Sequence, residues 1–269
     1  MGRSCHSGPV TSRPLILVRP PSPRLADGEL THLDRVPVDP GLAREQWAGY
    51  VAAFADRGWD VVEVDEAPEH ADGVFVEDAL VVVDRLAVLT SPGAASRRGE
   101  LTTTEAALVR LRDAGVDLEV VRIDGEGRLD GGDVLKVGDT VYVGRSARTN
   151  DEAIRQLAAY VEPLGRRVVP VPVTKVLHLK SGVTALPDGT VVGYAPLVDD
   201  PTAFERFLAV PEEHGTAVVD LGGGAVLMST DAPQTAALHR SRGLEVVTVP
   251  ISQFEALEGC VTCLSVRVR

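Results

Sequence analysis

The segment at residues 86–123, LAVLTSPGAASRRGELTTTEAALVRLRDAGVDLEVVRI, sets the structural pattern of the chain. An apolar strand leads through a Pro/Gly/Ser loop into an amphipathic helix, and a second strand rich in β-branched residues follows. Residues 141–171 and 225–249 repeat this order. A fourth copy begins with the strand LILV at 15–18 and continues, after a long loop, with a helix and a strand in 44–64.

The segment at residues 176–220 fits the repeat less closely. There we expect GTVVGYA (189–195) to form a strand and DPTAFERFLAVP (200–211) to form a short helix capped by Asp200. Five units of about 50 residues then account for the chain, and self-similarity at such a period indicates modules that are stacked or closed into a ring. A doubly wound α/β sheet is the alternative that also uses strand–helix–strand units.

No linker interrupts the series, so we expect one domain over residues 14–269, preceded by a disordered extension at 1–13. The glycine run at 222–224 lacks the GK[ST] ending of a phosphate loop and leads into a strand. We therefore expect it to serve close backbone packing near the centre of the ring.

Composition excludes several classes of function. With 44% hydrophobic and 25% charged residues and no apolar run of about 18 residues, the chain has the composition of a water-soluble globular protein. Its 39 acidic and 27 basic side chains give a net charge of −12, which argues against binding to nucleic acid. Three cysteines cannot form a disulfide framework, and the first fourteen residues lack an apolar signal segment, so a reducing cytoplasm is the expected setting.

The cysteines near the chain end are the first candidates for chemistry. Cys260 and Cys263 lie in EGCVTCLSVRVR, where LSVRVR alternates as a terminal strand. A structural zinc site needs four ligands, yet the only other cysteine is Cys5. A thioredoxin-type pair usually opens a helix rather than a strand. Two inert core residues, or one nucleophilic cysteine working with a distant histidine, remain open.

Among the other polar residues, His178 stands out because KVLHLKSGVTAL places it within an apolar alternation. Glu77 and Asp78 interrupt a stretch that otherwise resembles a buried strand, and buried carboxylates need a cation beside them. Arginines in equivalent loops of two successive modules suggest a shared anionic ligand, since Arg grips carboxylates bidentately. Solvated turns are the alternative explanation for Asp133, Glu77 and Asp78, which cluster with Asp72 and Asp130 where strands meet loops. A salt bridge at the start of a helix is the alternative for the arginines Arg97, Arg98 and Arg148.

Five motifs in order resemble the dimethylarginine dimethylaminohydrolases, which are guanidine-modifying enzymes built on a five-bladed α/β-propeller (pentein) of ββαβ modules around a central active site. The similarity spans residues 14–269. The motifs are FVEDALVV, LTSPGAASRRGE, LDGGDVLKVGDTVYVGRSARTN, VLHLKSGVTAL and GCVTCLSVRVR.

The resemblance implies a role for each matched residue. Cys263 falls on the nucleophile, His178 on the acid/base and Asp130 on the acidic position of the GGD turn. Asp72, Glu77, Asp78, Arg97 and Arg148 fall on substrate-binding positions, as do backbone carbonyls near Leu30, in a lid, and near Leu257. In this scheme Asp78 and Asp130 hold the guanidinium, the two arginines hold the α-carboxylate, and Asp72 holds the α-amino group.

The implied activity is hydrolysis of N-ω-methylated arginine to citrulline and an alkylamine through a covalent Cys263 thiouronium, with no metal or other cofactor. The partner expected is a small-molecule substrate, and a homodimer is compatible with the sequence. The alternatives are an arginine deiminase or an amidinotransferase on the same scaffold, or a propeller that binds a partner without catalysis.

Overall fold

The computed structural model describes residues 13–269, so all but the last residue of the extension expected at 1–13 lies outside the described part of the chain. Within this range, none of the helices combines the length and the apolar character that crossing a lipid bilayer requires.

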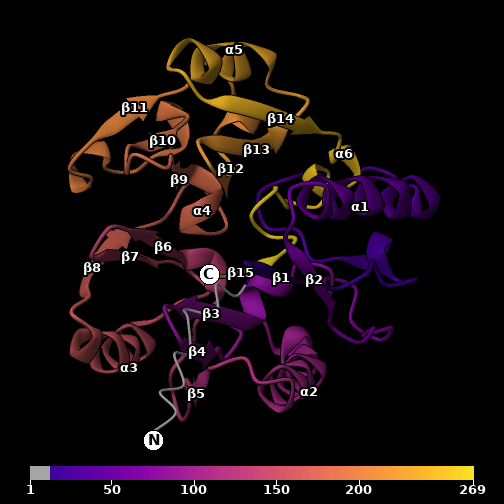
Figure 1. Cartoon of the computed structure of the whole chain (residues 1–269), viewed down its shortest axis with the longest axis vertical. Helices are drawn as coiled ribbons and strands as arrows, with labels where there is room; N and C mark the ends of the chain where they lie inside the picture. The colour runs from indigo at the N-terminus through magenta and orange to yellow at the C-terminus, as the bar shows by residue number, and fades with distance from the viewer. Residues whose placement is uncertain (1–12) are drawn as a thin grey trace, which may run out of the picture.

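The strands form five separate sheets of three strands each, arranged around a common centre (Figure 1). In every sheet the middle strand pairs antiparallel with one neighbour and parallel with the other. The sheets, each given in spatial order, are β15 (Val266–Val268), β1 (Leu15–Val18) and β2 (Asp60–Glu63); β3 (Leu80–Val83), β4 (Leu86–Leu89) and β5 (Glu119–Arg122); β6 (Val134–Val137), β7 (Thr140–Arg145) and β8 (Arg167–Pro172); β9 (Val183–Ala185), β10 (Val191–Gly193) and β11 (Phe207–Ala209); and β12 (Val218–Gly222), β13 (Ala225–Ser229) and β14 (Glu245–Val249).

A helix joins the two parallel strands in four of the five modules, and Figure 1 shows these helices on the outside of the ring. They are α1 (Pro40–Ala55), α2 (Glu100–Asp113), α3 (Asp151–Val161) and α5 (Pro233–Ser241). Local sequence explains where they start. Asp39 caps α1 just before a proline at its first position, and Asn150 caps α3 by accepting a hydrogen bond from the Ala153 amide.

The prediction of a helix at residues 200–211 is wrong. The Asp200 cap is present, because its carboxylate accepts from the Thr202 amide at 2.9 Å, but only the single turn η7 (Pro201–Ala203) follows. The chain then extends, and Phe204 packs edge-on against Tyr142 of the preceding module with ring centroids 5.1 Å apart. Tertiary packing of this aromatic residue ends the helix that the cap begins.

Closure of the ring depends on the chain ends. The terminal strand β15 pairs antiparallel with β1, so the last strand of the chain completes the module that the first strand begins. This pairing confirms the prediction of a ring of modules and excludes the doubly wound sheet. The strands β15, β3, β6, β9 and β12 are the inner members of their sheets, and all of them line one axial cavity.

The hydrophobic core lies between adjacent modules rather than inside any of them. In β3, for example, Leu80 and Val82 pack with residues of β1 and β15, while Val81 and Val83 pack with residues of β6 and β7. Successive side chains of a strand point to opposite faces, so all four residues of β3 are buried between two neighbouring modules. This explains the uninterrupted apolar runs that the sequence shows in place of alternation.

The glycine run does not serve close packing. Gly222, Gly223 and Gly224 are exposed in the turn between β12 and β13, and a Cβ atom on any of them would meet no other atom within 4 Å. All three have positive φ values of 61–86°, which a glycine adopts without steric cost. The turn conformation, not crowding, requires them.

Candidate active site

A small cavity of about 20 Å³ lies where loops from several modules converge. Seven of the ten residues singled out from the sequence line it, and Asp130 lies directly behind one of them. The residues that line it are Glu29, Asp72, Phe75, Asp78, Arg97, Arg148, Leu177, His178, Leu257, Glu258, Gly259 and Cys263.

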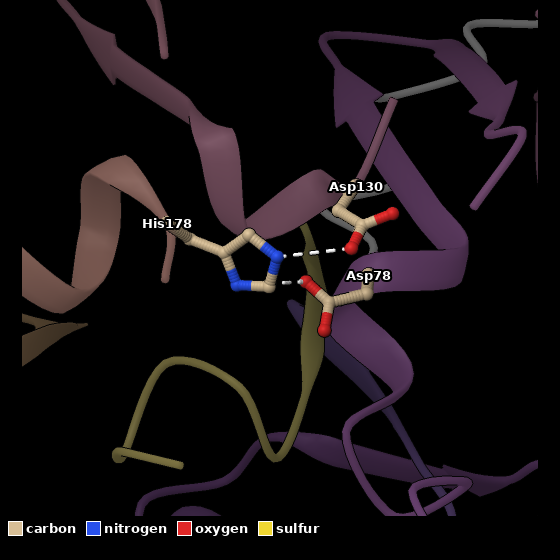
Figure 2. Close-up of side chains that lie close together, drawn as sticks. All are labelled: Asp78, Asp130 and His178. Atoms are coloured by element: carbon tan, nitrogen blue, oxygen red, sulfur yellow. Dashed lines mark hydrogen bonds and ion pairs between the residues drawn. The ribbon is translucent and has the colours of Figure 1, made fainter. Parts of the chain in front are cut away.

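His178 lies in the apolar alternation noted in the sequence, and it immediately precedes the short helix α4 (Leu179–Gly182). Its ring lies between two carboxylates, as Figure 2 shows. Nε2 donates to Asp130 Oδ2 at 2.9 Å, and Nδ1 lies 3.8 Å from Asp78 Oδ1. Burial disfavours a charged imidazole, but the two acids outweigh it and raise the pKa of His178 to about 9. The ring is therefore an imidazolium at neutral pH.

The GGD turn explains how both acids reach the ring. The short helix η4 (Gly131–Asp133) follows Asp130, and the Gly132 amide donates to Asp78 Oδ1 at 2.8 Å. A Cβ atom on Gly132 would lie 2.7 Å from both Asp78 Oδ1 and His178 Nδ1, so only glycine permits this approach. Burial raises the pKa of Asp78, but the positive charges of His178 and Arg97 reverse the effect and lower it to about 2.

The two arginines differ in how fully they are engaged. Arg97 is buried, donates to Asp78 Oδ2 at 2.5 Å and forms a two-pronged ion pair with Glu100. Its Nη2 also donates to the backbone carbonyls of Asp72 and Phe75, which leaves one Nη1 proton without a partner among the described residues. Arg148 is more accessible and makes a single ion pair, with Glu29 at 3.2 Å. Arg148 is thus the freer of the two cations.

Cys263 lies in the turn that precedes β15, in agreement with the loop-to-strand position expected for it. Its amide donates to the Cys260 carbonyl at 3.1 Å, and the two sulfur atoms are 3.4 Å apart. The two sulfur atoms are within hydrogen-bond distance of each other. The hydrogen bond from Cys263 lowers the pKa of Cys260 to about 7, while the hydrogen bond with Cys260 and burial raise the pKa of the Cys263 thiol.

Two predicted substrate-binding residues are not in the cavity wall. Glu77 belongs to the turn η2 (Val76–Ala79), not to a strand. Its carboxylate faces Lys180 at 2.6 Å and Arg267 at 2.9 Å, and it is not among the residues that line this cavity. It also accepts from the Thr262 hydroxyl at 2.9 Å. Leu30 packs against the hydrophobic core, and its neighbour Glu29 takes its place in the wall.

Three acids that the sequence argument did not assign shape the site. Glu29 joins the lid to Arg148 and to Ser96. Glu258 accepts hydrogen bonds from the backbone amides of residues 31–33 and so fastens the lid to the segment before Cys263. Asp133 accepts from the Leu179 amide and the Ser146 hydroxyl and so fixes the start of α4. Of these three acids, only Asp133 could be recognised as a candidate from the sequence, because it belongs to the GGD motif.

The remaining predicted residues lie in the wall. Asp72 accepts from the Glu29 amide at 3.1 Å, and burial raises its pKa. Leu257 lies beside the lid anchor Glu258. A metal ion would find three ligand atoms within 4.8 Å of one another at Asp78, Asp130 and His178. In this structure the protonated imidazole already supplies the positive charge between the two carboxylates.

The ring of five three-stranded modules, four of them with the ββαβ order, carries a cysteine and an acid-flanked histidine at its axis. This arrangement defines the class of the protein, a pentein of the guanidine-modifying kind. No family model matches the chain. Among curated proteins, N(G),N(G)-dimethylarginine dimethylaminohydrolase of Streptomyces coelicolor is 58% identical over 253 residues, which cover 94% of this chain and 96% of that protein. The enzyme of the same name from Pseudomonas aeruginosa is 34% identical over 256 residues, 94% and 98% of the two chains.

Comparison with solved structures identifies the same family of enzymes. The dimethylarginine dimethylaminohydrolase of Pseudomonas aeruginosa, in complex with citrulline, superposes with a TM-score of 0.85 at 33% identity and covers 94% of this chain and 98% of that one. The chain belongs to the dimethylarginine dimethylaminohydrolase family.

Proposed function

We propose that this protein hydrolyses N-ω-methylated L-arginine to L-citrulline and dimethylamine or methylamine, as the names of its relatives describe for them. The observation that carries the proposal is the placement of Cys263 and of a charged His178, held between Asp78 and Asp130, in one cavity. Arg148 in the same wall provides a cation for the carboxylate of an amino acid.

The cavity chemistry suits a cationic substrate. The thiol of Cys263 holds its proton tightly in the free enzyme, since Cys260, Glu77 and Asp78 all raise its pKa. A guanidinium bound beside the sulfur favours the thiolate, because opposite charges stabilise each other, and the proton leaves to solvent. The nucleophile is therefore activated by the substrate it attacks.

In the first half-reaction the thiolate of Cys263 adds to the guanidinium carbon and forms a carbon–sulfur bond. The alkylamine nitrogen is too basic to leave as an anion, so the imidazolium of His178 gives it a proton as the carbon–nitrogen bond breaks. Nδ1 donates this proton, because Nε2 is engaged with Asp130. The products are a free alkylamine, a thiouronium on Cys263 and a neutral His178.

In the second half-reaction water attacks the thiouronium carbon. Neutral His178 takes one proton from the water as the carbon–oxygen bond forms, and the carbon–sulfur bond then breaks to release the thiolate. The remaining hydroxyl proton leaves to solvent, which yields neutral citrulline. The flanking carboxylates stabilise the imidazolium that results. Asp130 and Asp78 thus keep the ring oriented and protonated at the start and the end of each turnover.

The α-amino and α-carboxylate groups of the substrate bind on the side of the cavity that the lid covers. Arg148 binds the α-carboxylate in place of Glu29, and Arg97 contributes its remaining Nη1 proton. Asp72 holds the α-amino group. A cavity of about 20 Å³ admits roughly one water molecule, so substrate entry requires the Glu29 contacts to open.

The proposal also covers the setting and assembly of the protein. We expect residues 14–269 to unfold as one cooperative unit, the protein to act in the cytoplasm and the chain to form a homodimer. A single thermal transition, cell fractionation and sedimentation analysis test these three expectations separately.

The deciding experiment is a comparison of substrates. Citrulline release is measured in parallel from N-ω-monomethylarginine, asymmetric dimethylarginine and arginine, with alkylamine and ammonia quantified in the same samples. We expect citrulline and alkylamine in equal amounts from the methylated substrates and much slower turnover of arginine. Equal or faster release from arginine, with ammonia, would assign the chain to deiminase chemistry instead.

A further inference from the structure

Cys260, the cysteine that the proposed reaction does not use, lies beside the nucleophile but faces a different cavity. Cys263 lines the active-site cavity of about 20 Å³, whereas Cys260 lines a cavity of about 320 Å³, which we call the side cavity. Neither thiol belongs to the lining of the other cavity. The two linings have Leu177, Glu258 and Gly259 in common, so these residues form the wall between the cavities.

The side cavity admits small molecules that the active-site cavity excludes. Cys263 is only 6% exposed, and its cavity holds about one water molecule. Cys260 is half-buried, and the exposed residues His32, Leu33 and Glu213 also line its cavity, which therefore opens at the protein surface. A small reagent in solution thus reaches the sulfur of Cys260 without passing the contacts of Glu29 that close the active site.

The turn between the two cysteines brings them to a separation from which a disulfide can form. The Cys263 amide donates to the Cys260 carbonyl at 3.1 Å, and the two sulfur atoms are 3.4 Å apart. The Cα atoms at the ends of such a four-residue turn lie within about 7 Å, and disulfides join Cα atoms about 4.4–6.8 Å apart. Small rotations of the two side chains therefore bring the sulfur atoms into bonding contact with little movement of the backbone.

The two thiols also differ in reactivity. Thiolates, rather than thiols, react with hydroperoxides. The hydrogen bond from Cys263 lowers the pKa of Cys260 to about 7, whereas the pKa of Cys263 is raised. An accessible thiol that ionises near neutral pH, beside a second thiol that can displace oxygen from it, is the arrangement found in redox-sensing proteins.

We propose that Cys260 is an oxidation site for hydroperoxides and that Cys263 then converts the oxidised sulfur into a disulfide. The thiolate of Cys260 attacks one oxygen of the hydroperoxide, so that a sulfur–oxygen bond forms, the oxygen–oxygen bond breaks and the departing oxygen takes a proton from solvent. The sulfur of Cys263 next attacks that of Cys260. The sulfur–sulfur bond forms as the sulfur–oxygen bond breaks, and the hydroxide leaves as water with the proton of Cys263. In total, two thiols are oxidised to one disulfide and one hydroperoxide is reduced.

The disulfide switches the enzyme off, because it removes the sulfur that adds to the guanidinium carbon. This consequence rests on the proposed function, whereas formation of the disulfide does not. A dithiol reductant reverses the change by thiol–disulfide exchange. Cys260 thereby couples the activity at Cys263 to the concentration of hydroperoxide in the side cavity.

Mass spectrometry of the unsubstituted protein tests the oxidation. Reduced protein in buffer without reductant is treated at pH 7 with one equivalent of hydrogen peroxide, and the remaining thiols are blocked with N-ethylmaleimide. Trypsin cleaves nowhere between Cys260 and Cys263 and separates both from Cys5. We expect the peptide with both cysteines to lose the mass of two hydrogen atoms. Citrulline release from N-ω-monomethylarginine should fall in proportion to this species, and dithiothreitol should restore it.

Two matched variants establish which sulfur is oxidised first. Cys263→Ser lacks the second thiol, so the sulfenic acid of Cys260 should persist and be trapped when dimedone is added in a denaturing quench. Cys260→Ser keeps only the enclosed thiol, and we expect about tenfold less dimedone label on Cys263 after the same exposure to peroxide. Equal or greater labelling in Cys260→Ser would overturn the assignment of Cys260 as the oxidation site.

The failure of this inference is distinguishable from the failure of the proposed function. Loss of activity in the unsubstituted protein with both cysteines still unlinked would overturn the disulfide. A disulfide that forms while citrulline release continues would support the oxidation site and contradict the nucleophilic role of Cys263. The mass measurement requires no turnover, and it decides the question even if a variant fails to fold.

Discussion

Replacement of Asp130 by Asn tests the electrostatics of the catalytic imidazole. The pKa of His178 rises from its usual value near 6.5 to about 9, which corresponds to a preference for imidazolium of about 3 kcal/mol. Asp78 and Asp130 share this effect, and the hydrogen bond of 2.9 Å from Nε2 belongs to Asp130. Asn keeps an acceptor but removes the charge, so we expect the pKa of His178 to fall by about one unit. At pH 8 the imidazolium fraction then falls from about nine tenths to about half.

Two measurements check this expectation. The alkaline limb of kcat reports the loss of the proton from His178 in the substrate complex, and it should move to lower pH in Asp130→Asn. Histidine Cε1 resonances report the same titration in the free enzyme. Asp124→Asn, at an exposed loop carboxylate, is the matched control and should leave both unchanged. An unaltered titration of His178 in Asp130→Asn would refute the assignment of its charge to this acid.

The same pKa shift has a consequence for stability. Because the folded-state pKa of His178 is raised, its contribution to the free energy of unfolding is fully present below about pH 6.5 and is lost as the pH rises through about 9. Urea unfolding at these two pH values should therefore show a smaller difference in Asp130→Asn than in the unsubstituted protein. An equal difference would mean that other groups dominate the pH dependence.

Three further substitutions probe other parts of the site. Arg148→Lys removes the fork that grips a carboxylate and should raise KM by an amount equivalent to about 1–3 kcal/mol with little change in kcat; an unchanged KM would limit Arg148 to holding the lid. Cys260→Ser removes the thiol partner that raises the pKa of Cys263, so the pH midpoint of iodoacetamide modification should move down, and an upward shift would contradict this effect of Cys260 on Cys263. Gly132→Ala inserts a methyl group 2.7 Å from Asp78 Oδ1 and should abolish turnover while the protein still folds; full activity would show that the GGD turn can yield.

Most of the fold could be predicted from sequence because each module repeats the same order of apolar runs and loops. The buried runs of β3 and β4 show no alternation, and packing between two neighbouring modules explains why. The module that contains β9, β10 and β11 differs from the prediction at residues 200–211. Asp200 and the following proline are true helix-start signals, but they carry no information about Phe204, whose contact with Tyr142 is made across modules.

The sequence predicts the site residues that belong to a recognisable motif. It does not predict the direction of a side chain where that direction is set by the conformation of a local turn. Glu77 and Asp78 are adjacent, yet the turn η2 directs the first toward Lys180 and the second toward His178. No sequence pattern distinguishes these two directions. Glu258 was missed for a related reason, since its bonds to lid amides depend on a left-handed residue at φ +60° that only coordinates reveal.

Intact-protein mass spectrometry after rapid acid quenching tests the central claim most directly. Protein mixed with N-ω-monomethylarginine should carry, during turnover, one added mass equal to the substrate less methylamine, and peptide analysis should place it on Cys263. The variant His178→Ala is treated with an amidine whose leaving group needs no proton, so that the adduct can form without His178. This adduct should persist, because no imidazole is present to take a proton from the attacking water. No adduct at any quench time with citrulline still forming, or an adduct on Cys260, would contradict the account.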